Sequence, residues 1–236
     1  MLIEVVTHCY ARRLPFYAKM LSYQLSSFVI DKPKYCSVQA TICTEDSDVK
    51  TLETISWFLK HTDLNIKLLI LNREQMSRRC EGRNLAAQSS TADVIWFADV
   101  DQVYRDGIID RLAETPFPDG CVHIFPKEVM TCGSKRTTQY ANINHPMVLD
   151  IDPEDFGVKI RTRSIGGSQI IKGDFAREHG YLDKDPKGGP GNKEPFSFRC
   201  DDDIYFRRVC ERVGKVVPVD LPGMYRFLHR EKGRNV

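Results

Sequence analysis

The sequence predicts an α/β fold in which a mostly parallel sheet is flanked by helices. In the first half of the chain, short apolar runs typical of buried strands alternate with segments of helical period. Several of these runs end in polar residues, as expected where a strand reaches the edge of a sheet. With 236 residues, of which 42% are hydrophobic, the chain can bury a core without disulfides.

Apolar or alternating runs predict the strands of the first half, and apolar residues at helical spacing predict its helices. The predicted strands are 2–6, 37–43, 66–71 and 94–98, and the predicted helices are 16–29, 49–61 and 75–89. This alternation is typical of a parallel sheet with helices on its faces.

The second half is expected to be mixed. We expect strands at 120–125 and 129–131, an extended segment at 165–172, and helices at 107–113, 174–180 and 201–213. Segment 135–163 is polar and predicted to be rich in loops, and 183–195 consists almost entirely of helix and strand breakers, which predicts a long flexible loop. Because no internal repeat or long linker interrupts the pattern, we expect a single domain over 1–236.

The charge of the chain is nearly balanced. The formal net charge is +2, from 34 basic and 32 acidic residues, so no global field attracts nucleic acid or an anionic membrane. No apolar stretch approaches eighteen residues, so we expect no membrane span. Residues 1–6 are short and carry Glu4, which favours a strand over a signal peptide.

The eight cysteines lack the spacing of zinc ribbons or redox pairs. Several lie in apolar surroundings, where a free cysteine acts as a small buried hydrophobe. We therefore expect reduced thiols and a cytoplasmic protein. A soluble catalytic fragment of a membrane-anchored protein would have the same composition, so that alternative stays open.

Asp99 and Asp101 directly follow the apolar run 94–98. Ligands of open α/β sheets bind beyond the carboxyl ends of such strands. Two carboxylates at this position suit a hard divalent cation that bridges to phosphate oxygens. A solvated acidic pair is the alternative interpretation.

A second acidic cluster, Asp201-Asp202-Asp203, opens the last strong helix. Carboxylates in a first helical turn are favoured by the helix dipole, so capping is one interpretation. Three in succession exceed what a cap needs, and their repulsion raises carboxylate pKa values, which suits a general base. Both interpretations stay open on composition alone.

Five short motifs, in order along most of the chain, resemble inverting glycosyltransferases of the GT-A fold, family 2-like and closest to the β-1,4-galactosyltransferase form. The motifs are Phe97-Ala-Asp-Val-Asp101, Cys200-Asp-Asp-Asp-Ile-Tyr-Phe-Arg207, Arg83-Asn84, Gly166-Gly167-Ser168 and His229. The resemblance implies a Rossmann-like GT-A domain with a nucleotide-sugar-binding half at 1–101 and a mixed acceptor-binding and catalytic half at 102–236.

The resemblance also implies roles for individual residues. Asp201 corresponds to the catalytic base of the family. The implied metal ligands are Asp99, Asp101 and His229, and the metal is Mn2+ or Mg2+. The implied substrate-binding residues are Thr7, His8, Tyr10, Arg12, Glu45, Asp46, Arg83, Asn84, Asp99, Gly166, Gly167, Asp202, Asp203 and Arg226.

Two positions depart from the family pattern. Cys200 stands in place of a glutamate that often holds the acceptor, and Arg226 stands where a methionine precedes the metal-binding histidine. Arg226 therefore either weakens the metal site or contacts phosphate directly. We also expect the glycine-rich loop to act as a lid over donor or acceptor.

The function implied by the resemblance is metal-dependent, inverting transfer of a sugar from a nucleotide-sugar, a UDP-sugar by preference, to a hydroxyl of a glycan or related acceptor. A cation offsets the departing diphosphate, and a carboxylate removes the proton of the attacking hydroxyl. The alternatives are a nucleotidyltransferase that makes nucleotide sugars and a non-catalytic carbohydrate-binding relative. The segment 7–14 has no glycine, which disfavours the nucleotidyltransferase.

Overall fold

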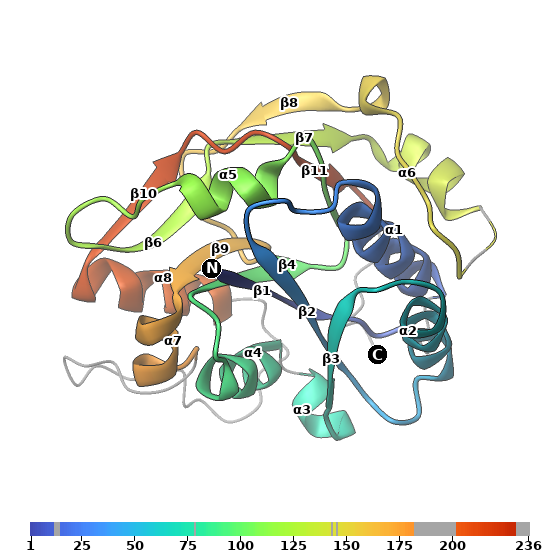
Figure 1. Ribbon diagram of the computed structural model, residues 1–236, viewed down its shortest axis with the longest axis horizontal. Helices are drawn as coiled ribbons and strands as arrows, with labels where there is room; N and C mark the ends of the chain where they lie inside the picture. The colour runs from blue at the N-terminus through green and yellow to red at the C-terminus, as the bar shows by residue number, and fades with distance from the viewer. Residues whose placement is uncertain (12–14, 78, 143, 145, 182–201, 230–236) are drawn as a thin grey trace.

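A seven-stranded sheet forms the centre of the computed structural model, which describes residues 1–11, 15–77, 79–142, 144, 146–181 and 202–229 (Figure 1). The strand order is β10-β6-β9-β4-β1-β2-β3. These strands are β1 (Leu2–His8), β2 (Ser37–Thr44), β3 (Asn65–Ile70), β4 (Val94–Asp99), β6 (Cys121–Pro126), β9 (Ser168–Lys172) and β10 (Lys215–Val219).

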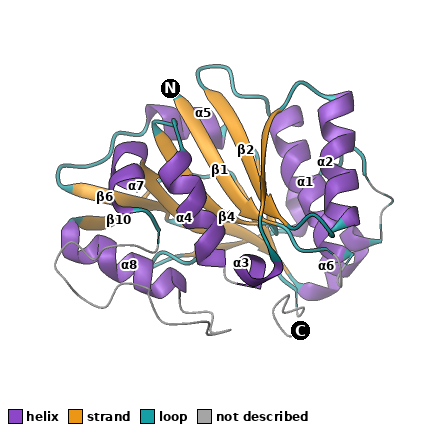
Figure 2. Cartoon of the chain, turned by 90° about the horizontal axis from the view of Figure 1, so that it is seen from below, coloured by secondary structure: helices purple, strands orange, loops and turns teal. Residues whose placement is uncertain are grey.

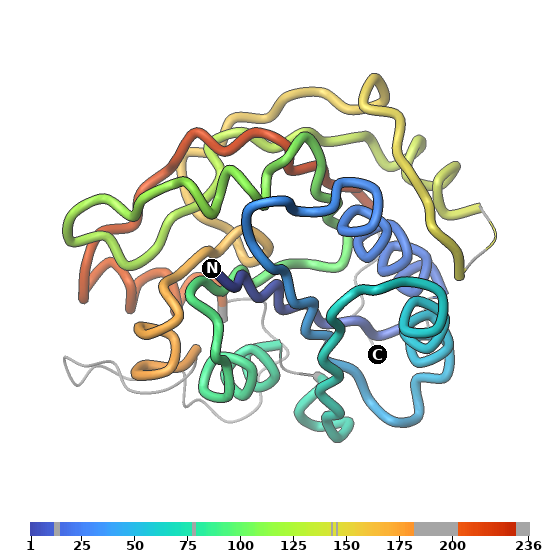
Figure 3. Tube along the Cα trace, viewed as in Figure 1, coloured from blue at the N-terminus to red at the C-terminus, as the bar shows by residue number. Residues whose placement is uncertain are grey.

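Strands β1 to β4 pair in parallel, as the alternating pattern predicts. Strand β9 runs antiparallel to both of its neighbours, β4 and β6. The trace in Figure 3 follows this order, with β9 in orange. The expected α/β fold with a mostly parallel sheet is confirmed.

Helices cover both faces of the sheet. They are α1 (Phe16–Ile30), α2 (Val49–His61), α3 (Arg73–Ser77), α4 (Arg79–Ser89), α5 (Ile108–Glu114), α6 (Ser134–Ala141), α7 (Gly173–His179) and α8 (Asp202–Val213), with a 3-10 turn at Pro153–Asp155. Figure 2 shows β1 and β4 between α4 and α7 on one side and α1 and α2 on the other.

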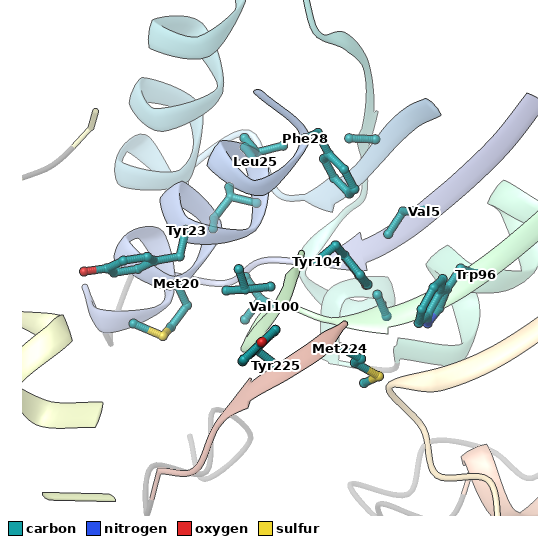
Figure 4. Close-up of a cluster of buried hydrophobic side chains, with 14 of the residues drawn as sticks. Val5, Met20, Tyr23, Leu25, Phe28, Trp96, Val100, Tyr104, Met224 and Tyr225 are labelled. Carbon is teal, nitrogen blue, oxygen red and sulfur yellow. The ribbon is translucent and has the colours of Figure 1, made fainter. Parts of the chain in front are cut away.

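The alternation of side chains along each strand divides the core into two layers. In β4, Trp96 packs in the cluster on the α1 face, whereas Phe97 packs in the cluster on the α4 face. Figure 4 shows part of the α1-face cluster, where the rings of Phe28 and Tyr104 stack with centroids 5.3 Å apart. Both faces of β4 are therefore buried, which explains its continuous apolar run.

A second, four-stranded sheet packs against the α1-face cluster. Its order is β5-β11-β7-β8, formed by β5 (Gln102–Tyr104), β7 (Glu128–Cys132), β8 (Gly157–Ile160) and β11 (Met224–Phe227). Residues of β5, β7 and β11 belong to the same core cluster as Trp96 and Phe28. The second sheet places the residues of β11 next to the end of β4.

Two of the predicted segments can be compared with the structure in more detail. The helix expected at 75–89 is described as α3 and α4, which lie on either side of residue 78, a residue outside the described part of the chain. The loop-rich segment 135–163 contains most of α6 and all of β8. Strand β8 is exposed along its length, so it lacks the apolar alternation that would identify it.

Two further observations concern the described part of the chain alone. None of its helices combines the length and apolarity that a membrane span requires. Its seven cysteines are all free thiols. The cytoplasmic location and the single-domain organisation stay predictions. Cys200 and the loop 183–195, with its expected role as a lid, lie outside the described residues.

Candidate functional site

The candidate site lies at the carboxyl edge of the parallel strands. His8, the last residue of β1, is paired in register with Cys43 of β2 and with Asp99, the last residue of β4. Beyond Asp99 the chain turns into β5, which places Asp101 just outside the main sheet. The structure therefore places the two aspartates at the edge where α/β sheets bind ligands.

Asp99 is held by three arginines. Its Oδ1 lies 2.5 Å from Nη1 of Arg79 and 3.3 Å from Nη2 of Arg83, and its Oδ2 lies 3.5 Å from Nη2 of Arg226. The carboxylate side chain is 15% exposed. Its negative charge is thus already balanced by the protein.

Asp101 is more deeply buried and less fully paired. Its Oδ2 accepts a 3.0 Å hydrogen bond from Nε of Arg226 and lies 3.5 Å from Nε2 of His229. Within the described residues, its buried Oδ1 has no hydrogen-bond partner. The His229 ring packs edge-on against Phe16 and Tyr17 of α1. Arg226 therefore lies between the two aspartates.

A buried polar network joins Asp99 to the start of α8. Arg83 Nη1 donates to the Tyr181 hydroxyl at 3.0 Å, and this hydroxyl donates to Oε1 of Gln169 at 2.6 Å. Gln169 Nε2 in turn donates to the backbone carbonyl of Asp203 at 3.0 Å. The network fixes α8, which begins within the second acidic cluster, relative to β4.

The two adjacent glycines pass between the acidic clusters. The Gly166 N–H donates to Oδ2 of Asp203 at 2.8 Å. A Cβ on Gly167 would lie 2.1 Å from Nε2 of Gln102 and 2.8 Å from Oδ2 of Asp99. A side chain at this second position would therefore force the side chains of Gln102 and Asp99 to shift. The structure thus brings the predicted glycine pair to both acidic clusters.

Arg83 and Arg226 remain cationic despite their burial. Burial alone would lower the pKa of the Arg83 guanidinium, but Tyr181 and Asp99 outweigh it and raise the pKa overall. For Arg226 the opposing effect of burial is likewise outweighed, by Asp101 and then Asp99, so its pKa is raised. The site therefore carries permanent guanidinium charges.

The remaining predicted residues lie at the same edge or support it. Thr7 is fully buried, and Tyr10 packs partly buried beside the α4-face cluster. Glu45 is buried and accepts a 2.7 Å hydrogen bond from Ser47, whereas Asp46 is exposed. Asn84 Oδ1 accepts a hydrogen bond from the backbone N–H of Tyr181.

Arg83, one of the implied substrate-binding residues, is deeply buried. Its side chain is 2% exposed, and its donors reach Tyr181, the Ala98 carbonyl and Asp99. Arg12, Asp201 and the side chain of Asp202 lie outside the described residues, so the structure does not place them.

The described residues do not form the divalent-metal site that the motifs imply. They contain no group of three or more histidine, cysteine, aspartate or glutamate side chains placed to hold a metal. Arg226 occupies the space between Asp99 and Asp101. Oδ1 of Asp99 already accepts a hydrogen bond from Arg79, and Oδ2 of Asp101 accepts one from Arg226. The buried Oδ1 of Asp101 is the one ligand atom of this pair left open in the described part of the chain.

Sequence reasoning missed two polar residues near the site. Gln169 is fully buried within the strand β9 and connects Tyr181 to Asp203. A glutamine in an otherwise apolar strand is a recognisable signal, because buried amides require partners. Arg161 follows β8. It is more than fifty residues away from Asp99 and Asp101 in the sequence, and no sequence signal links it to them.

Solved structures share the fold at low sequence identity. S. aureus TarS matches with 14% identity and a TM-score of 0.58, covering 97% of this chain and 37% of that chain. Its fragment 1–349 in complex with UDP matches with 13% identity and a TM-score of 0.55, covering 97% and 61%. The sequence matches none of the protein-family profiles and no curated protein.

A third similar structure is the mannosyltransferase PcManGT from Pyrobaculum calidifontis in complex with GDP-Man and Mn2+. It matches with 13% identity and a TM-score of 0.51, covering 98% of this chain and 57% of that chain. The chain thus spans between 37% and 61% of the length of these three structures. The likeness establishes a GT-A-like glycosyltransferase fold.

Proposed function

We propose that this protein transfers a sugar from a nucleotide-sugar donor to a hydroxyl group of a glycan or related acceptor. The observation that carries the proposal is the convergence of Asp99, Gly167 and Asp203 at the carboxyl edge of a GT-A-like sheet. Structures of the same fold were solved in complex with UDP and with GDP-Man. A nucleotide-sugar is therefore the ligand class that fits this edge best.

The reaction we propose is one displacement at the anomeric carbon. The acceptor oxygen forms a bond to that carbon as its bond to the diphosphate breaks, and the nucleoside diphosphate leaves with the electron pair. Asp201 is proposed to take the proton of the acceptor hydroxyl, as a general base does. A single displacement inverts the configuration of the transferred sugar.

Asp203 and Gly166 support this assignment of roles. The hydrogen bond between the Gly166 N–H and Oδ2 of Asp203 holds the start of α8 against the glycine turn. Asp201, which precedes Asp203 by two residues in the sequence, lies outside the described residues and is proposed as the base on the motif resemblance. Asp202 and Arg12 stay predicted substrate contacts.

The proposed donor nucleotide and the cation that the resemblance implies have different support. UDP is proposed on the motif resemblance, and TarS was solved in complex with UDP. Mn2+ or Mg2+, with Asp99, Asp101 and His229 as ligands, is the cation that the resemblance implies, and PcManGT was solved with Mn2+. The described residues do not form that metal site.

A donor panel tests the proposal. The full chain is incubated with UDP-sugars and GDP-sugars, with Mn2+ and separately with EDTA, and nucleotide release and binding are measured by chromatography and calorimetry. We expect one donor to be bound and slowly hydrolysed. Asp201→Asn should abolish transfer and retain binding. A protein that neither binds nor hydrolyses any donor would contradict the proposal.

Substitution of Gly167 tests whether the glycine turn belongs to the site. Gly167→Ala places a methyl group against Gln102 and Asp99, and the resulting shift should lower kcat/KM about 100-fold, as misplacement of reacting groups does. Gly133→Ala is the matched control, because a Cβ at Gly133 meets nothing within 4 Å. Equal activity of the two variants would mean that the glycine turn is not part of the site.

A further inference from the structure

Arg226 occupies the position between two carboxylates that a bound cation would take. Its Nε lies 3.0 Å from Oδ2 of Asp101, and its Nη2 lies 3.5 Å from Oδ2 of Asp99. The backbone fixes this placement, because Arg226 lies in β11 and is paired in register with Gln102 of β5. The guanidinium is therefore a built-in feature of the site.

The guanidinium of Arg226 has N–H donors that its two ion pairs do not use and that a ligand could engage. An arginine carries five N–H donors, and the two ion pairs involve Nε and Nη2. Within the described residues no hydrogen bond or ion pair involves Nη1, and the side chain is 22% exposed. A fork of this kind matches the geometry of phosphate oxygens.

Arg161 adds a second positive charge beside Arg226. Burial lowers the pKa of Arg161, the nearby charge of Arg226 lowers it further, and Asp101 raises it, so the three groups act on one another. The buried Nε of Arg161 has no hydrogen-bond partner in the described part of the chain. A buried donor without an acceptor is costly, and an anion at this position would satisfy it.

The surroundings of the aspartates are therefore cationic. The two carboxylates contact three arginines, and Arg161 lies within electrostatic reach. A divalent cation would have to displace Arg226 from Asp101 and would be repelled by the neighbouring guanidinium groups. A diphosphate would meet complementary charge without such a displacement.

We propose that Arg226, with Arg161 beside it, binds the diphosphate of the donor, so that nucleotide binding at this site requires no divalent cation. In this arrangement Asp99 and Asp101 orient Arg226 instead of coordinating a metal. The guanidinium charge offsets the negative charge that the leaving diphosphate acquires. The inference rests on the proposed function, because it names what that site uses to hold the donor.

Calorimetric titration of the full chain with UDP and with GDP tests the inference directly. We expect one of these nucleotides to bind in EDTA with an affinity within about 10-fold of that in Mn2+, since the guanidinium groups supply charge-assisted hydrogen bonds. Binding that appears only with Mn2+ would overturn the inference and leave the proposed function intact. Absence of binding in EDTA and in Mn2+ would contradict both the inference and the proposed function.

Variants identify the groups that bind the nucleotide. Arg226→Met should weaken binding in EDTA about 10-fold to 100-fold, the loss of a hydrogen bond to a charged group, and Arg161→Gln should weaken it in the same direction. Arg136→Met is the control, because Arg136 forms a comparable ion pair with Asp155, 2.9 Å apart, in a different part of the chain. Unchanged binding in both site variants would overturn the inference.

Mn2+ binding without nucleotide gives an independent measurement. Removal of the resident guanidinium in Arg226→Met frees Oδ2 of Asp101, so free Mn2+, measured by electron paramagnetic resonance, should bind more tightly to the variant than to the wild type. Tighter Mn2+ binding by the wild type would mean that Arg226 assists the metal and would contradict the inference. Thermal unfolding of each variant confirms that it is folded.

Discussion

Two buried groups of carboxylates in this protein are compensated in different ways. Glu4, in the middle of β1, is fully buried and accepts hydrogen bonds from the hydroxyl groups of Thr41 and Ser90. Asp99 and Asp101, at the carboxyl edge, are compensated by guanidinium groups. Neutral hydroxyl partners satisfy a carboxylate within the sheet, whereas guanidinium partners at its edge leave donors available to a ligand.

The comparison separates residues that maintain the fold from residues that meet the ligand. Among the arginines on Asp99, Arg83 is 2% exposed and Arg79 is 31% exposed, although both contact Oδ1. We therefore assign Arg83 to the buried structural group and Arg79 and Arg226 to the accessible group. The substitutions Arg83→Met and Glu4→Met test this division, and a third prediction tests another buried polar group of the interior, His123.

The largest effect is expected from Arg83→Met. The substitution leaves Asp99 with less compensation and removes donors from Tyr181 and the Ala98 carbonyl, which should cost about 3–5 kcal/mol, as loss of one partner of a buried pair does. The free energy of unfolding in urea measures it. Arg79→Met, which removes a partner from the same oxygen, is the control and should cost no more than about 1 kcal/mol.

A smaller effect is expected from Glu4→Met. The variant leaves the buried hydroxyl groups of Thr41 and Ser90 without their acceptor, which should cost about 1–3 kcal/mol in unfolding free energy. Adding Thr41→Val should recover part of the loss, because the Thr41 hydroxyl that lost its acceptor is then gone. Ser90 is kept, because its hydroxyl also accepts from the Ala92 N–H. Nucleotide affinity should stay unchanged throughout. A drop in affinity would contradict the division between interior and edge.

The third prediction concerns the pH dependence of the unfolding free energy that is due to His123, and its effect for each pH unit is the smallest of the three. Its Nε2 lies 2.9 Å from the Ser164 hydroxyl, and burial, together with the charge of Arg207, lowers the pKa of the imidazole to about 3. Because the unfolded chain takes up the proton first, stability is full above pH 6.5 and falls as the pH drops toward 3.

The slope should be about 1.4 kcal/mol for each pH unit in that window. Unfolding in urea at several pH values measures it, and His123→Gln should flatten the dependence. His61→Gln, at an exposed position, is the control and should leave the slope in place. An equal slope in wild type and His123→Gln would assign the pH dependence to other groups.

The first half of the fold could be predicted from the sequence because its signals are local. Helix α2 begins after Asp48, whose side chain caps it, and ends at His61 as predicted. Strand β4 reads as a buried strand because both of its faces are covered. Buried parallel strands of this kind can be recognised from their own apolar run, so their distant pairing partners need not be known.

The second sheet could not be predicted because its strands are short and depend on distant partners. Strand β5 has three residues and pairs with β11, more than a hundred residues later in the chain. The ion pairs of Arg226 depend on that same long-range pairing. Asp99, Asp101 and Gly167 are recognisable from their motifs, and the sequence also marks Arg226 as a departure that either weakens the metal site or contacts phosphate. Its ion pairs with Asp99 and Asp101 required the three-dimensional arrangement.

Strand β9 has a consequence for how the chain folds during synthesis. Among the strands of the described residues, β9 alone lies between β4 and the pair formed by β6 and β10 in the seven-stranded order. In a nascent chain that ends before Ser168, one edge of β4 is therefore unpaired, and β6 lacks the strand that connects it to the sheet. Unpaired edges of this kind recruit other chains. Translation pauses or truncations before residue 168 should produce aggregates, and a nascent chain that includes β9 should escape them.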